Sequence, residues 1–119
     1  MKHDFKALGQ AVDSSNTTLS LALYYAEILK RDVLDFGDAM HDSHLSGIVK
    51  FLDENRICEI TVSSSWSGTL NALIFFLNHG WKVVGTAKVE SGTFSYKPGD
   101  DGEYVRVKDT VEALRLVKE

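Results

Sequence analysis

The sequence contains a single cysteine, Cys58, and a single proline, Pro98. One cysteine excludes an internal disulfide, and this favours a reducing compartment. The longest apolar runs, residues 21–26 and 72–77, fall far below the ~20 residues that a membrane span needs. Residues 1–30 also lack the order of charged, apolar and small residues that a secretory signal has. We therefore expect a cytoplasmic protein that does not enter a membrane.

The chain also has little net charge. Its 13 Lys and Arg against 17 Asp and Glu give a formal charge of −4. General affinity for phosphate backbones needs clustered basic residues, so we do not expect nucleic acid as a partner. The 119 residues are 44% hydrophobic and 25% charged, which is typical of one globular domain spanning residues 1–119. A chain of this length buries a core without a disulfide or a structural metal.

Hydrophobic periodicity predicts helices in the N-terminal half and one helix beyond it. Apolar residues recur at helical spacing over residues 4–12, 17–30, 43–55 and 67–79. The second and fourth of these helices are apolar over so much of their circumference that they need cover on more than one side. A last helix is predicted after Asp109, with Glu112 as the second residue of a capping box. Val111, Leu114 and Val117 would form its apolar stripe.

Alternation of apolar and polar residues predicts three strands, at residues 58–63, 82–89 and 103–108. Cys58 is expected on the apolar face of the first strand as an inert core thiol. A strong turn signal covers residues 97–102. Strands that alternate are typical of a sheet with one covered face. We therefore predict an α/β (α+β) two-layer sandwich, with a small mixed sheet of three or four strands and helices mainly on one face.

The strand–helix–strand unit at residues 58–89 is expected to cross over right-handedly and give a parallel strand pair. Polar faces of the predicted strands carry basic residues beside Tyr104. These are Lys82, Lys88, Arg106 and Lys108. Basic and aromatic residues on a sheet face are a pattern that some nucleic-acid-binding proteins use. In so acidic a chain, a solvated sheet face is the favoured interpretation.

A serine-rich turn offers the first candidate site, between the strand at 58–63 and the helix at 67–79. Backbone N–H groups and the helix dipole favour an anion at such a helix start. The candidate ligand-binding residues are Ser64, Ser65, Trp66, Ser67, Gly68 and Thr69. The simpler interpretation is that Ser65 or Ser67 caps the helix. No Walker loop or dinucleotide fingerprint is present, and Ser65 has no evident base that would make it a nucleophile.

Carboxylates and imidazoles between residues 35 and 44 offer the second candidate site. The candidate metal ligands are Asp38, His41, Asp42 and His44. Imidazole and carboxylate together suit zinc, iron or manganese. The competing interpretation is a solvated loop in which Asp42 caps the next helix. No motif in the chain identifies a cofactor.

These patterns favour a non-enzymatic interaction or regulatory module that acts through self-association or a protein partner. The evidence is the broad apolar surface of the helices at 17–30 and 67–79. In the helix at 67–79, Phe75 and Phe76 spread beyond the stripe that is expected to face the sheet, which consists of Leu70, Leu73, Ile74 and Leu77. Such a helix in a short chain is typical of a subunit interface. The alternative is a domain that binds a small anion, phosphate or carboxylate, or a hydrolase-like enzyme that uses the turn at residues 63–69.

Overall fold

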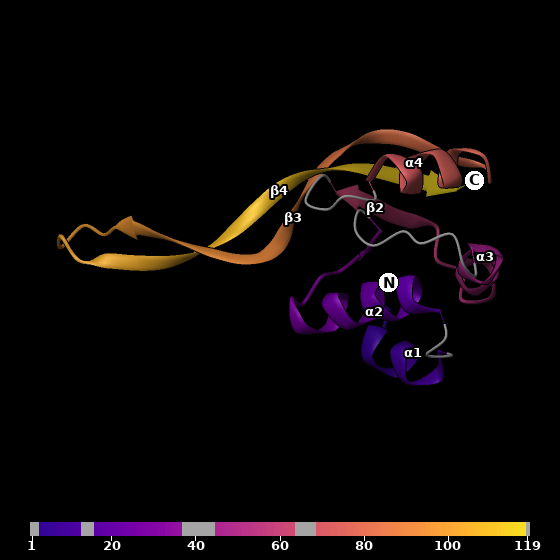
Figure 1. The fold of residues 1–119 in the computed structure, drawn as a ribbon, viewed down its shortest axis with the longest axis horizontal. Helices are drawn as coiled ribbons and strands as arrows, with labels where there is room; N and C mark the ends of the chain where they lie inside the picture. The colour runs from indigo at the N-terminus through magenta and orange to yellow at the C-terminus, as the bar shows by residue number, and fades with distance from the viewer. Residues whose placement is uncertain (1–2, 13–15, 37–44, 64–68, 119) are drawn as a thin grey trace.

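The computed structural model describes residues 3–12, 16–36, 45–63 and 69–118. These residues form four helices and one four-stranded mixed sheet (Figure 1). The predicted mixed α+β class and the helical N-terminal half are confirmed. The helices are α1 (Phe5–Ala11), α2 (Thr17–Ile28), α3 (Leu45–Glu54) and α4 (Thr69–Leu77). Among the described helices, none has the length and apolar character that crossing a membrane requires.

Capping residues explain where the first two helices begin. The Asp4 carboxylate accepts a hydrogen bond from the Ala7 N–H, and the Asn16 side chain accepts one from the Leu19 N–H, each at 3.1 Å. These bonds satisfy donors that have no partner within the helix. The structure thus starts α1 one residue after the predicted helix start and α2 at its predicted start.

Left-handed residues explain how α2 and α3 end. Lys30 follows α2 with φ 52° and Arg56 follows α3 with φ 54°. Beyond them, the Arg31 N–H donates to the Ala26 carbonyl and the Ile57 N–H donates to the Leu52 carbonyl, each at 2.9 Å. This is the Schellman arrangement, which stops a helix and redirects the chain. A short connection then leads from the end of each helix to a strand of the sheet.

The sheet has the strand order β1-β2-β4-β3. Its strands are β1 (Leu34–Asp35), β2 (Glu59–Ser63), β3 (Trp81–Pro98) and β4 (Tyr104–Lys118). β1 and β2 are parallel, whereas β4 is antiparallel to both β2 and β3. The predicted parallel pair at residues 58–89 is wrong, because β4 lies between β2 and β3. Those two strands run in the same direction without being neighbours.

The helix predicted after Asp109 is also wrong, because residues 104–118 form the single strand β4. The spacing of Val111, Leu114 and Val117 suits a helix locally. In the fold, however, the strand has a hydrogen-bonded neighbour on each side for residues 113–117, and it buries Ala113 and Leu116. Long-range pairing and burial have overridden the local pattern, as they commonly do for strands.

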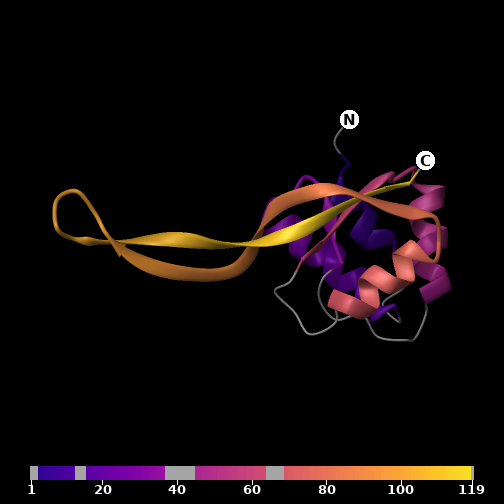
Figure 2. The ribbon, with the colours of Figure 1, turned by 90° about the horizontal axis from the view of Figure 1, so that it is seen from above.

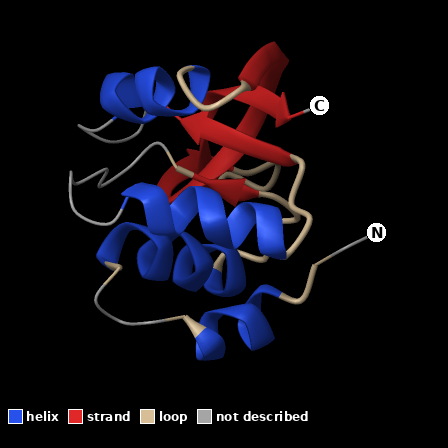
Figure 3. Ribbon diagram, turned by 90° about the vertical axis from the view of Figure 1, so that its right-hand side faces the viewer, coloured by secondary structure: helices blue, strands red, loops and turns tan. Residues whose placement is uncertain are grey.

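The core lies between the sheet and the helices and is centred on aromatic rings. Phe76 of α4 packs against Phe36, with ring centroids 5.2 Å apart, and against Trp81, at 5.8 Å. Fully buried aliphatic residues from three strands join them. These are Leu34, Ile60, Val62 and Leu116. The helices are not clearly gathered on one face: Figures 1 and 3 show α4 above the strands and α1 and α2 below them.

The expected inward direction of Leu70, Ile74 and Leu77 in α4 is wrong, and so is that of Cys58. In α4, Phe75 and Phe76 are buried and Leu73 packs against the core as expected, whereas Leu70, Ile74 and Leu77 are exposed. The bulkier rings have taken the inward face, so the helix is rotated relative to the expectation. Cys58 is exposed and its Sγ lies 3.6 Å from the Arg56 carbonyl oxygen. Buried Ile57 occupies the core just before β2 begins.

The last two strands are much longer than the body of the sheet requires. Beyond residue 90 they leave the other elements and continue as a two-stranded arm, which Figures 1 and 2 show projecting from the body. We call residues 91–109 the arm. It accounts for the elongated shape, whose principal extents are 51 × 28 × 28 Å.

Candidate interaction site on the β3–β4 arm

Both sites predicted from the sequence lie mainly outside the described residues. This holds for Ser64, Ser65, Trp66, Ser67 and Gly68, and Thr69 is described only by its backbone, as the first residue of α4. It holds equally for the predicted metal ligands Asp38, His41, Asp42 and His44. Within the described part of the chain, no group of three or more His, Cys, Asp or Glu side chains is placed to hold a metal ion. Both sites stay predictions.

One polar cluster is described at the carboxyl edge of the parallel strands β1 and β2. The Asp35 carboxylate accepts hydrogen bonds from Thr61 Oγ1 and Ser63 Oγ, each at 2.8 Å. All three side chains are buried. The alternation in β2 suggested that Thr61 and Ser63 lie on an open polar face, but here they are satisfied inside the protein. A carboxylate at this edge electrostatically disfavours an anion beside it.

The arm presents a larger and more exposed set of side chains. Its register pairs Phe94 with Lys108, Tyr96 with Arg106 and Pro98 with Tyr104. Residues directly opposite in an antiparallel pair lie on the same face, and this face recurs every second residue. We call this set the aromatic face: Phe94, Tyr96, Pro98, Tyr104, Arg106 and Lys108. The other face carries Ser95, Lys97, Val105 and Val107.

The aromatic face is open to solvent. Phe94, Tyr96 and Tyr104 are exposed to 43%, 67% and 72%. The Arg106 guanidinium lies 4.1 Å from the centroid of the Phe94 ring, which is within range of a cation–π contact. Each of the two cations on this face lies opposite an aromatic residue in the register, Arg106 opposite Tyr96 and Lys108 opposite Phe94. The face thus combines large apolar rings with positive charge.

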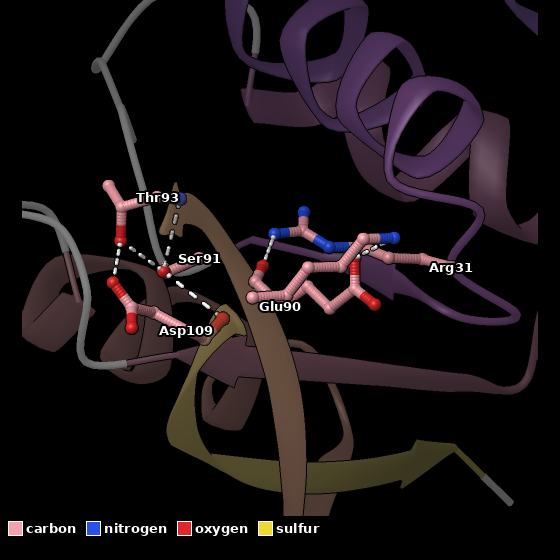
Figure 4. A network of polar contacts seen from close by, with 6 residues as sticks. Arg31, Glu90, Ser91, Thr93 and Asp109 are labelled. Atoms are coloured by element: carbon pink, nitrogen blue, oxygen red, sulfur yellow. Dashed lines mark hydrogen bonds and ion pairs between the residues drawn. The ribbon is translucent and has the colours of Figure 1, made fainter. Parts of the chain in front are cut away.

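A bulge and a hydrogen-bond network fix the base of the arm. The register shifts between Glu90 and Phe94, and Gly92 within the bulge has φ 86°. Bulges of this kind bend a strand pair away from its sheet. Beside the bulge, the Asp109 carboxylate accepts a hydrogen bond from Thr93 Oγ1 at 2.7 Å (Figure 4). It also accepts one from Ser95 Oγ at 2.6 Å. The hydroxyl donors Ser95 and Thr93 lower the pKa of Asp109, because they stabilise its charged form.

One contact to the body and two further contacts between β3 and β4 hold the same region. Arg31, in the connection after α2, donates from Nη2 to the Glu90 carbonyl oxygen (Figure 4). The Glu90 carboxylate lies 3.7 Å from the Lys108 ammonium. Ser91 Oγ donates to the Asp109 carbonyl oxygen at 3.3 Å. The arm is therefore anchored at its base, and its direction is set there.

The tip is a tight loop that carries negative charge. The Gly99 N–H donates to the Glu103 carbonyl at 2.6 Å, and the Gly102 N–H donates to the Gly99 carbonyl at 3.1 Å. Gly102 has φ 83°, a conformation that glycine adopts without strain. The predicted turn at residues 97–102 is confirmed. Exposed acidic residues surround it, namely Asp100, Asp101 and Glu103.

The sequence pattern identified some of the residues on this surface but did not predict how they are arranged. Tyr104, Arg106 and Lys108 were expected on one sheet face with Lys82 and Lys88. The register shift at Val84 places Lys82 and Lys88 on opposite faces of β3, because their partners are Val117 and Glu112. The expected single basic patch therefore does not form. The alternation of apolar and polar residues on both sides of the turn at 97–102 is the sequence pattern that indicates a long hairpin.

Comparisons with known proteins give one match. Residues 21–109 match the model of a family described as Domain of unknown function (DUF7698). No curated protein and no solved structure matches the chain. The matched range begins within α2 and includes the whole arm. Because the match covers more than half of the 119 residues, the chain belongs to the DUF7698 family.

Proposed function

We propose that the protein is a non-enzymatic interaction module and that the arm is its binding surface for a protein partner. The observation that carries this proposal is the exposure of Phe94, Tyr96 and Tyr104 on one face of a projecting strand pair. Large apolar groups that gather on one exposed face are typical of interaction sites. Aromatic residues and arginine are also the types enriched where binding energy concentrates.

The energetics of the arm support a partner. A two-stranded hairpin alone is marginally stable in water, and strands gain stability when a third strand or another layer covers them. Within the described residues, neither a helix nor another strand pairs with the arm beyond residue 90. Burying a side chain the size of phenylalanine contributes about 1.5–3 kcal/mol. Covering three exposed rings would therefore stabilise a complex by several kcal/mol before the cost of association.

The charge of the arm favours protein over nucleic acid. Residues 91–109 carry three basic residues, Lys97, Arg106 and Lys108. They also carry four acidic ones, Asp100, Asp101, Glu103 and Asp109. The difference, three minus four, leaves a net charge of −1. A surface of this balance has no excess of cations to release counterions from a phosphate backbone.

A second exposed apolar surface agrees with an interaction role. Leu70, Ile74 and Leu77 of α4 are exposed to 66%, 49% and 47% and follow one another at helical spacing. The alternative function, anion binding or hydrolysis at residues 63–69, has less support among the described side chains. Ser63, the first residue of that turn, donates its hydroxyl to Asp35.

In-cell photocrosslinking tests the proposal. A photoreactive phenylalanine analogue replaces Tyr96 on the arm, and the matched control carries it at Tyr24 of α2, which is also exposed, to 55%. We expect discrete crosslinked species from position 96 that are absent from position 24. The proposal is contradicted when position 96 gives no discrete species, or when both positions give the same ones.

A further inference from the structure

We infer that the partner of the arm is a second copy of this chain, with the two aromatic faces packed antiparallel about a twofold axis near Tyr104. The inference rests on the proposed function and adds the identity of the partner. It comes from the order in which chemical groups follow one another along the arm. From the base outward, the aromatic face carries Lys108 opposite Phe94, then Arg106 opposite Tyr96, then Tyr104 opposite Pro98, and the carboxylates lie at the tip.

The spacing of these groups suits a twofold arrangement. Arg106 lies two residues from Tyr104 toward the base, about 7 Å along a strand. On the other side of Tyr104, the tip places Glu103, Asp101 and Asp100 within four residues. Turning one arm by 180° about Tyr104 therefore brings each acidic tip toward the Arg106 of the other arm. The two Tyr104 rings meet at the axis.

Self-complementarity is what a symmetric dimer interface requires. In a twofold interface, a residue that contacts a second residue is contacted by the same residue of the partner, so one surface must contain both halves of each contact. The arm contains cations and carboxylates on either side of an apolar centre. An acidic peptide or a nucleic acid would match Arg106 and Lys108 but would be repelled by Asp100 and its neighbours at the tip. A second copy matches both ends.

The size of the contact predicts a weak dimer. An enclosed aromatic side chain buries roughly 150–250 Å². Given their exposed fractions, the Tyr96 and Tyr104 rings would contribute on the order of 200–350 Å² per copy. A stable interface of standard size buries about 800 Å² per partner. We therefore expect a dimer that dissociates on dilution and weakens with salt, because exposed charge pairs are screened.

Charge reversal in trans tests the pairing. In R106E, the glutamate of each copy faces the acidic tip of the other copy, so the dimer contains two repulsive contacts. In D100K, the lysine of each copy faces the basic residues of the other copy, which again gives two repulsive contacts. Each variant alone should dimerise about tenfold more weakly, because two exposed pairs change from attraction to repulsion. An equimolar mixture forms dimers with one copy of each variant. In such a dimer, the lysine introduced by D100K meets the glutamate introduced by R106E at one end, and the native Asp100 meets the native Arg106 at the other end. Dimerisation should therefore return.

Sedimentation equilibrium of the full chain, with one variant carrying a fluorophore, measures these affinities. The matched controls are K50E and E54K on α3, which make the same charge changes at an exposed pair in the body. Both controls should dimerise as the wild type does. Recovery in the mixture also shows that R106E and D100K are folded. If R106E and D100K each dimerise as strongly as the wild type, the interface lies elsewhere and the inference is overturned.

Two further outcomes separate the inference from the proposed function. A wild type that stays monomeric up to millimolar concentration, together with a crosslink from position 96 to a different protein, overturns the second copy and leaves the interaction role intact. Binding of a single-stranded oligonucleotide that R106E abolishes, with no dimer present, overturns both. A monomer with no crosslink from position 96 likewise overturns both.

Discussion

Replacing Asp35 should reveal how strongly the buried cluster at the carboxyl edge of β1 and β2 stabilises the fold. Hydrogen bonds to a charged group contribute about 1.5–3 kcal/mol each, and Asp35 accepts two from Thr61 and Ser63. D35A removes both, but it also removes the several kcal/mol that desolvating a buried carboxylate costs. We expect a net loss of about 2–4 kcal/mol in the free energy of unfolding. D35N should lose less, because its amide oxygen still accepts from one hydroxyl.

The coupling within this cluster decides whether the reasoning is right. In the triple variant D35A, T61V, S63A, the hydroxyl groups that D35A leaves without their acceptor are gone. We expect the triple variant to be much closer to the wild type than the sum of the single losses, because an unsatisfied buried polar group costs more than a missing hydrogen bond. Urea unfolding measures this as a change in midpoint at constant slope. Strict additivity of the three single changes would refute the cluster as a coupled unit.

Two further predictions concern the arm. Because the pKa of Asp109 is lowered, the carboxylate stabilises the arm above the ordinary pKa of 3.8, and this stabilisation is lost as the pH falls through the lowered pKa. Amide exchange at Thr93 and Ser95 should accelerate in that acidic range, and D109N should remove this dependence on pH. G99A places a Cβ 2.9 Å from the Glu103 carbonyl oxygen, whereas the Cβ of G85A meets nothing within 4 Å. G99A should therefore lower the stability of the arm by about 1–3 kcal/mol, measured by amide exchange, and G85A should leave it unchanged. Equal effects of G99A and G85A, or a D109N variant that keeps the pH dependence, would contradict the described geometry.

The sequence predicted the local elements well where one signal dominated. Helical periodicity located α1 and α2, and the turn signal at residues 97–102 located the end of the hairpin. These features depend on residues close together in the chain. These features can therefore be predicted without knowing the rest of the fold.

The errors arose where distant residues decide the structure. Val111, Leu114 and Val117 suit a helix by their spacing, and only the pairing of β4 with two other strands makes them part of a sheet. The rotation of α4 depends on how Phe76 fits between Phe36 and Trp81. Neither packing is encoded in local periodicity.

The candidate interaction site shows the same limit. Tyr104 and Arg106 were recognised as members of a polar sheet face. Alternation predicts that a strand has two different faces, but it does not say whether another layer covers either one. The exposure of the aromatic face became evident only from the position of the other elements.

An intermolecular distance tests the central claim most directly. In a background where Cys58 is replaced by serine, a spin label at residue 97 lies next to the Pro98–Tyr104 pair, and a label at residue 50 lies on α3 in the body. Pulsed electron paramagnetic resonance at high protein concentration should give a narrow intermolecular distance distribution for residue 97, at shorter distance than for residue 50. A shorter distance for residue 50, or no intermolecular signal from residue 97, would contradict the pairing of two arms.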